Sequence, residues 1–160
     1  MFDEVVIACH SDQALAILAD ASTAEREVLG AIRYSKNEVL LHQDATVMPR
    51  RLAAWASWNY HAQPDSNKAS LTYYMNRLQN FESSQPVFVT LNDSGNVDAN
   101  LVLKRVQYEH PVFDVAMLAA QQRHSEISGV NRTHYCGAYW RYGFHEDGVV
   151  SALRVVSKLA

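Results

Sequence analysis

A loop of glycine and aromatic residues near the end of the chain constrains its fold more than any other stretch. Residues 135–154 read YCGAYWRYGFHEDGVVSALR. This pattern predicts a short buried strand, a glycine-aromatic loop and a helix that opens on two acids, Glu146 and Asp147. Because a helix N-terminus presents free N–H groups and the positive end of the helix dipole, this loop is suited to an electron-rich ligand edge or a phosphate.

The length and composition of the chain fit one folded domain. With 160 residues, of which 48% are hydrophobic and 19% charged, the chain can bury a core. A net charge of -3 and a pI near 6.1 give no electrostatic reason to expect a nucleic-acid partner. The sequence has no apolar run long enough for a membrane span, so none is expected.

The cysteines and the first residues favour a cytoplasmic protein. Asp3 and Glu4 stand where a signal peptide would carry positive charge. Cys9 and Cys136 lie far apart in apolar segments, which is typical of inert buried thiols in a reducing compartment. The seven histidines have no metal-ligand spacing, so no metal site is expected.

Local signals predict an α+β fold with a mixed, partly antiparallel sheet, because several strands follow one another in the middle of the chain. Strands are expected at residues 5–9, 38–42, 53–61, 71–75, 86–91, 101–108 and 133–138. Helices are expected at residues 11–18, 114–126 and 146–159, and behind a capping box formed by Ser22 and Glu25. Turns are expected at residues 65–67 and 92–96.

Two of these elements predict apolar surfaces. Residues 5–9 form an apolar run that suits a strand buried on both faces, which indicates that the chain is the C-terminal part of something larger. In the last helix, the apolar side chains share one face. They are Val149, Ala152, Leu153 and Val156.

The ending resembles the C-terminal flavin-binding signature of flavin-containing amine oxidoreductases, on residues 136–140 and 143–154. Residues 2–9 look like the family's D-x-V-I-x-A strand, which re-enters the flavin domain. Residues 54–60 and 72–79 are similar to a bacterial subgroup described as predicted NAD/FAD-binding or amine oxidase-like proteins. The resemblance covers essentially the whole chain.

The resemblance implies the C-terminal part of an FAD-dependent oxidoreductase. Residues 1–20 and 131–160 would supply the closing strands and helix of a Rossmann-like FAD domain, and residues 21–130 the substrate-domain sheet. The reaction would be hydride removal from a small amine or lipid-like substrate, with no catalytic residue assigned. The implied cofactor-binding residues are Gly137, Ala138, Glu146, Asp147, Gly148 and Val149. The implied substrate-pocket residues are Trp58, Tyr60, Tyr73, Trp140, Tyr142 and His145.

The residues leave alternatives open. The dinucleotide fingerprint G-x-G-x-x-G is absent from the chain. The chain could therefore instead be a non-catalytic module that folds and self-associates through an exposed sheet edge without FAD. The aromatic loop could be a packed corner, and Glu146 and Asp147 could simply complement the helix dipole. Strand alternation places Trp58 and Tyr60 on one face, opposite Trp55, where they could equally be ordinary sheet aromatics.

Overall fold

The computed structural model describes residues 2–62 and 69–159 and divides the chain into two compact units. The first unit comprises Met1–Ser35 and Pro111–Ala160, and the second unit comprises Lys36–His110. The fold is mixed α+β, as the sequence predicts. The turn expected at residues 65–67 lies outside the described residues.

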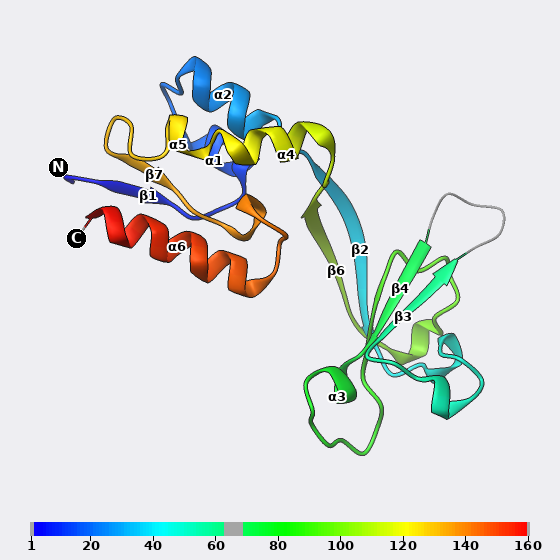
Figure 1. The fold of residues 1–160 in the computed structure, drawn as a ribbon. Helices are drawn as coiled ribbons and strands as arrows, with labels where there is room; N and C mark the ends of the chain where they lie inside the picture. Colours follow the sequence, from blue (N-terminus) through cyan, green and yellow to red (C-terminus); the bar gives the residue numbers. More distant parts are fainter. Residues whose placement is uncertain (1, 63–68, 160) are drawn as a thin grey trace. The chain divides into compact units, whose positions relative to one another are not determined.

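The first unit is built on two parallel strands, β1 (Val5–Ile7) and β7 (Thr133–Tyr135). Its helices are α1 (Ser11–Ile17), α2 (Thr23–Gly30), α4 (Val115–Gln122), α5 (His124–Ile127) and α6 (His145–Leu159). Figure 1 shows α6 along one side of the strand pair and the other helices gathered on the other side. The core of this unit includes Val28, Leu29, Met117, Ile127 and Tyr135. Because α2 packs on α1, α4 and α5, part of the segment assigned from the sequence to a middle domain, 21–130, belongs to this unit.

The capping box predicted at the start of α2 is confirmed. Ser22 Oγ accepts the N–H of Glu25 at 3.2 Å, and the Glu25 carboxylate accepts the N–H of Ser22 at 2.7 Å. The second carboxylate oxygen of Glu25 accepts the buried Tyr135 hydroxyl at 2.5 Å. Burial acts to raise the pKa of Glu25, but the hydrogen bonds from Tyr135 and Ser22 outweigh it and hold the pKa below its usual value. The cap therefore also ties α2 to β7.

The helix expected at residues 114–126 is broken in two at Arg123. The Arg123 N–H donates to Ala120 O at 3.0 Å, a tight three-residue turn, before α5 begins at His124. The Arg123 guanidinium bonds Glu126 on its own helix and Glu27 on α2, both at 3.0 Å. These contacts lie at the point where the chain changes direction.

The two predicted apolar elements of the first unit are not buried as expected. Val5 and Val6 are nearly half exposed, because β1 pairs with β7 alone among the described strands. On α6 the apolar stripe faces outward, with Val149, Leu153 and Val156 exposed by 53%, 61% and 57%, while Asp147, Ser151 and Val155 are buried. Among the described residues, no helix is both long enough and apolar enough to cross a bilayer.

The second unit is built around a five-stranded antiparallel sheet (Figure 1). In spatial order its strands are β3 (Trp58–Ala62), β4 (Ala69–Tyr74), β5 (Phe88–Leu91), β2 (Tyr34–His42) and β6 (Val102–Pro111). Its short helical turns are η1 (Ala45–Val47), η2 (Leu52–Ala54), α3 (Met75–Leu78) and η3 (Ala99–Leu101). The strand expected at residues 53–61 begins only at Trp58, because the Trp55 indole closes a turn by donating to Pro49 O at 2.8 Å.

The two faces of this sheet differ in cover. One face, here called the covered face, carries Leu40, Phe88 and Thr90, which are fully buried. The segment between β2 and β3 packs over it, with Met48 buried and the Trp55 ring 5.7 Å from the Phe88 ring. The opposite face, here called the open face, carries Trp58, Tyr60 and Tyr73, the aromatics that alternation places together.

Candidate functional site

Gly137 lies two residues after the end of β7, in the loop that leads into α6. A Cβ atom built on Gly137 would lie 2.4 Å from Cε1 of Tyr139, far inside van der Waals contact. The Tyr139 ring is buried and lies 5.0 Å from the Trp140 ring. The Gly137 N–H donates to Ser151 Oγ of α6 at 3.1 Å. The missing side chain and the amide of Gly137 are therefore both used by contacts inside the chain.

Asp147 closes the first turn of α6. Its Oδ2 accepts the N–H of Phe144 at 3.0 Å, and its Oδ1 lies 3.7 Å from Nε of Arg141. Asp147 is buried, whereas Glu146 and Val149 are exposed. A carboxylate at this position satisfies an orphan donor and complements the helix dipole, which is one of the two roles that the sequence left open for it.

The first turn of α6 also leaves backbone donors free beside an open glycine. The N–H groups of His145, Glu146 and Asp147 precede the first amide that bonds four residues back, that of Gly148 to Phe144 O at 3.3 Å. A Cβ on Gly148 would meet only Ala138, at 3.9 Å. The Ala138 N–H has no hydrogen-bond partner among the described residues. This group of amides fits the acceptor-rich edge of a planar ligand, whereas Gly137 does not offer its amide to one.

The aromatic residues of the loop split into two groups. Tyr139 and Trp140 of η4 (Ala138–Trp140) belong to the core of the first unit, and the Trp140 ring lies 4.4 Å from the ring of His124. Burial raises the pKa of the Tyr139 hydroxyl. Neither that hydroxyl nor the Trp140 indole N–H has a partner among the described residues. Tyr142 is exposed beneath the Arg141 guanidinium, 5.4 Å from its ring centre, and His145 is exposed nearby in sequence.

The open face of the second unit presents three aromatics in register. Trp58 pairs with Tyr73 across β3 and β4, and their rings meet edge to face with 5.2 Å between centroids. Trp58 and Tyr60 are exposed by 53% and 71%. Tyr73 is half-buried, and burial raises its pKa. Large apolar rings left exposed on one sheet face are typical of a binding surface.

The candidate substrate-pocket residues are thus divided between the units. Trp58, Tyr60 and Tyr73 lie in the second unit, whereas Trp140, Tyr142 and His145 lie in the first. The structure brings Gly137, Ala138 and Gly148 close to one another in the first unit, and it buries Trp140. That both groups of aromatics line one pocket stays a prediction.

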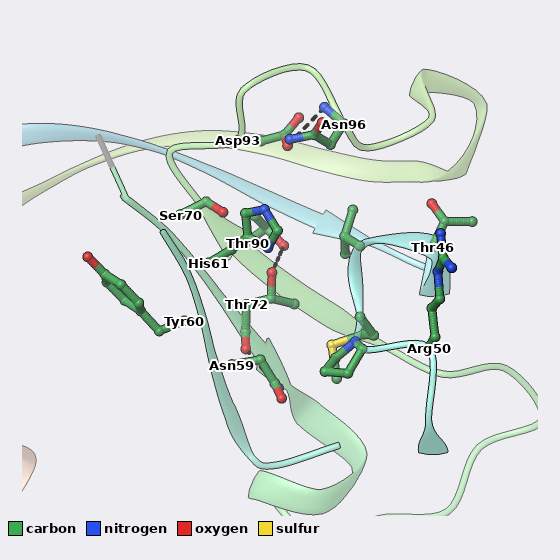
Figure 2. Close-up of a pocket in the computed structure, with 13 residues that line it drawn as sticks. Thr46, Arg50, Asn59, Tyr60, His61, Ser70, Thr72, Thr90, Asp93 and Asn96 are labelled. Atoms are coloured by element: carbon green, nitrogen blue, oxygen red, sulfur yellow. Dashed lines mark hydrogen bonds between the residues drawn. The ribbon is translucent and has the colours of Figure 1, made fainter. Parts of the chain in front are cut away.

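The sequence analysis missed a polar pocket on the covered face of the second unit, drawn in Figure 2. Ser70, Thr72 and Thr90 line it from the sheet. The signal was the period-two placement of hydroxyl residues at positions 70 and 72, which alternates with Leu71 and Tyr73. Only the register, which sets Thr90 opposite Thr72, brings these hydroxyls together.

Comparison with solved structures shows a likeness of fold. No profile of a known protein family and no curated protein matches the chain. Among solved structures, the chain is similar to one named "putative protoporphyrinogen oxidase" from Exiguobacterium sp. 255-15, with a TM-score of 0.58 and 13% identity. The match covers 98% of this chain and 41% of that protein, so the chain spans less than half of its length. The likeness is one of fold.

Proposed function

We propose that the chain is the C-terminal part of an FAD-dependent oxidoreductase of the amine oxidase type. The first unit would contribute the flavin-contacting loop and helix, and the second unit would contribute the sheet of the substrate pocket. A fold shared over nearly the whole chain with a protein named as an oxidase supports this proposal. Fold likeness alone does not fix a function, so the argument depends on the site.

The observation that carries the proposal is the start of α6. Ala138 N would lie 3.9 Å from a Cβ built on Gly148, and the N–H groups of His145, Glu146 and Asp147 are free in the same first turn of α6. The chemistry that FAD supplies is acceptance of a hydride, which leaves negative charge on the pyrimidine edge of the flavin. The amides at the positive end of α6 would hold that edge and stabilise its charge. Exposed Val149 would pack against the ring system, and buried Asp147 would keep the first turn in place.

The substrate side of the proposal depends on the open face of the sheet. Trp58, Tyr60 and Tyr73 offer uncharged aromatic surface, which suits the carbon skeleton of an amine or a lipid-like molecule. Tyr142 and His145 are exposed on the loop of the first unit, where they would be free to contact a substrate. The bond broken would be a C–H next to nitrogen or in an alkyl or unsaturated chain, and the protein residues would orient it.

The phosphates of FAD require a further polypeptide segment. The chain has no G-x-G-x-x-G loop, and the Gly137 amide is occupied by Ser151. The first unit also leaves apolar surface exposed, at Val5 and Val6 on β1 and along the α6 stripe. Burial of that surface against the segment that binds the phosphates would complete the two-stranded sheet as part of a larger one.

An FAD titration tests the flavin site. The chain offers contacts to the flavin ring but no loop for the phosphates, so we expect weak, saturable quenching of flavin fluorescence by the purified chain. We expect loss of that quenching in Gly148→Trp, because an indole would fill the open position. Lys158→Trp, exposed in the last turn of the same helix, is the matched control and should bind as the wild type does. Equal binding by Gly148→Trp and the control would contradict the assignment of α6. Oxidase assays on amines and unsaturated lipids would follow a positive result.

A second candidate function is a non-catalytic module that self-associates without FAD. The exposed stripe of Val149, Leu153 and Val156 favours it, because an apolar helix face of this kind is normally covered. The occupant would be the same stripe on a second copy, brought together about a two-fold axis.

Substitution on the stripe tests this second candidate. In sedimentation experiments, Leu153→Glu should weaken self-association by about tenfold or more, because a charge would be buried without a partner. Arg154→Glu, at the adjacent exposed position, changes the charge without touching the stripe and should leave association within about threefold of wild type. A wild-type chain that stays monomeric at every concentration would rule out this function.

A further inference from the structure

The polar pocket of the second unit has the size of a small-molecule site. Its volume is about 540 Å³, within the range of known ligand pockets. Figure 2 shows Ser70, Thr72 and Thr90 on the side of the sheet, and Thr46 and Arg50 on the segment across from them. Every lining residue belongs to the second unit, and the proposed flavin contacts all belong to the first.

A buried chain of hydrogen bonds sets the direction in which the hydroxyl groups of the pocket point. The backbone N–H of Asp44 donates to His42 Nδ1 at 3.2 Å, so the proton of the neutral imidazole lies on Nε2. Nε2 of His42 then donates to Thr90 Oγ1 at 2.7 Å. Because the fully buried Thr90 hydroxyl has no other acceptor among the described residues, we assign it as the donor in its 2.8 Å bond to Thr72 Oγ1, the dashed line between them in Figure 2. Burial lowers the pKa of His42, which keeps the imidazole neutral at neutral pH.

This chain of hydrogen bonds ends at the Thr72 hydroxyl, a donor that has no acceptor among the described residues. Because Thr72 Oγ1 accepts from Thr90, its own proton is free, and no acceptor for it is found among the described residues. Ser70, which is only 7% exposed, lines the same wall, and its hydroxyl also has no partner in the described part of the chain. Both hydroxyls line the pocket, so each can donate to a ligand that supplies acceptor atoms.

The charged groups of the pocket point to the same class of ligand. Arg50 forms no ion pair within the described residues. The carboxylate of Asp93 already accepts the N–H groups of Gly95, Asn96 and Val97 in its own turn, at 3.1 to 3.3 Å. The pocket therefore has hydroxyl donors and a guanidinium to offer, while its own carboxylate is occupied.

We propose that this pocket binds a small organic molecule through a carboxylate group. The hydroxyls of Ser70 and Thr72 donate to carboxylate oxygens at the sheet, and Arg50 across the pocket supplies the compensating charge. The site is separate from the proposed flavin contacts, so binding of the carboxylate requires neither FAD nor a second polypeptide.

Calorimetric titration of the full chain with succinate tests the proposal, with the neutral diamide succinamide as the matched probe. We expect succinate to bind with a Kd below about 10 mM and succinamide to show no binding in that range. Ser70→Ala and Arg50→Gln should each weaken succinate binding by about fivefold or more, because the first removes a hydroxyl donor and the second removes the positive charge. Arg51→Gln is the control, since Arg51 is the adjacent exposed arginine and does not line the pocket.

The same titrations can overturn the proposal. Equal binding of succinate and succinamide would mean that the pocket does not recognise a carboxylate. Binding of succinate that falls as much in Arg51→Gln as in Arg50→Gln would reflect surface charge alone. Absence of binding up to about 10 mM, in a chain whose Ser70→Ala variant unfolds at the wild-type temperature, would remove the assigned role of the pocket.

Discussion

Replacing Gly137 with alanine is expected to lower the midpoint of thermal unfolding by about 3–10 °C, which corresponds to about 1–3 kcal/mol of overpacking. The added Cβ would lie 2.4 Å from the ring of Tyr139. That ring is buried against Trp140 and cannot move into solvent. The backbone at Gly137 is extended and is open to any residue, so the clash with the ring is the cause. Circular dichroism during heating measures the change.

Gly148→Ala is the matched control for this substitution. A Cβ at Gly148 would lie in ordinary contact with Ala138, 3.9 Å away. Since glycine in a helix is less stable than alanine by about 0.5–1 kcal/mol, the variant should unfold at the wild-type temperature or slightly above it. If Gly137→Ala and Gly148→Ala unfolded at the same temperature, the packing of Tyr139 on Gly137 would not be what requires the glycine.

Glu25→Ala is expected to cost about 2–4 kcal/mol of folding free energy. The substitution removes the cap on Ser22 and leaves the fully buried Tyr135 hydroxyl without its acceptor. Urea titration at neutral pH measures the loss. The variant Glu27→Ala is the control on the same helix, because its ion pair with Arg123 is exposed and should contribute less than about 1 kcal/mol.

A double substitution separates the two parts of this effect. Adding Tyr135→Phe to Glu25→Ala removes the orphaned hydroxyl, so the two losses should be less than additive. Because hydrogen bonding holds the folded pKa of Glu25 below its usual 4.5, its contribution is complete above that pH and is lost as the pH falls through the folded value. The difference in unfolding free energy between the wild type and Glu25→Ala should therefore become smaller at acid pH. If the losses of stability from Glu25→Ala and Tyr135→Phe were additive, the capping carboxylate of Glu25 and the Tyr135 hydroxyl would not be coupled.

The elements set by neighbours in sequence were those that the sequence predicted best. The capping box of Ser22 and Glu25 needs residues three apart and forms as expected. The strand expected at residues 71–75 is present as β4. The helix expected at residues 114–126 is two helices in the structure, α4 and α5, and the break at Arg123 was not predicted from the sequence.

Part of the candidate site could also be predicted, because that part depends on residues that are neighbours in sequence. The glycine-aromatic loop and the acid-opened helix could be read from residues 135–154, but the use of Gly137 by Tyr139 could not. That clash depends on the rotamer of a ring two residues away, which the core of the first unit selects. The split of the loop aromatics into buried Trp140 and exposed Tyr142 was equally a matter of packing.

The sequence by itself determined the α+β class, most element positions, the aromatic alternation of β3 and the free amides at the start of α6, because these follow from backbone periodicity and local hydrogen bonding. Only the tertiary structure decided which side of α6 is buried and how His42, Thr90 and Thr72 align. Periodicity shows that a helix has an apolar face, but not what covers it. Strand register, which joins residues 48 apart, is set by the packing of the whole sheet.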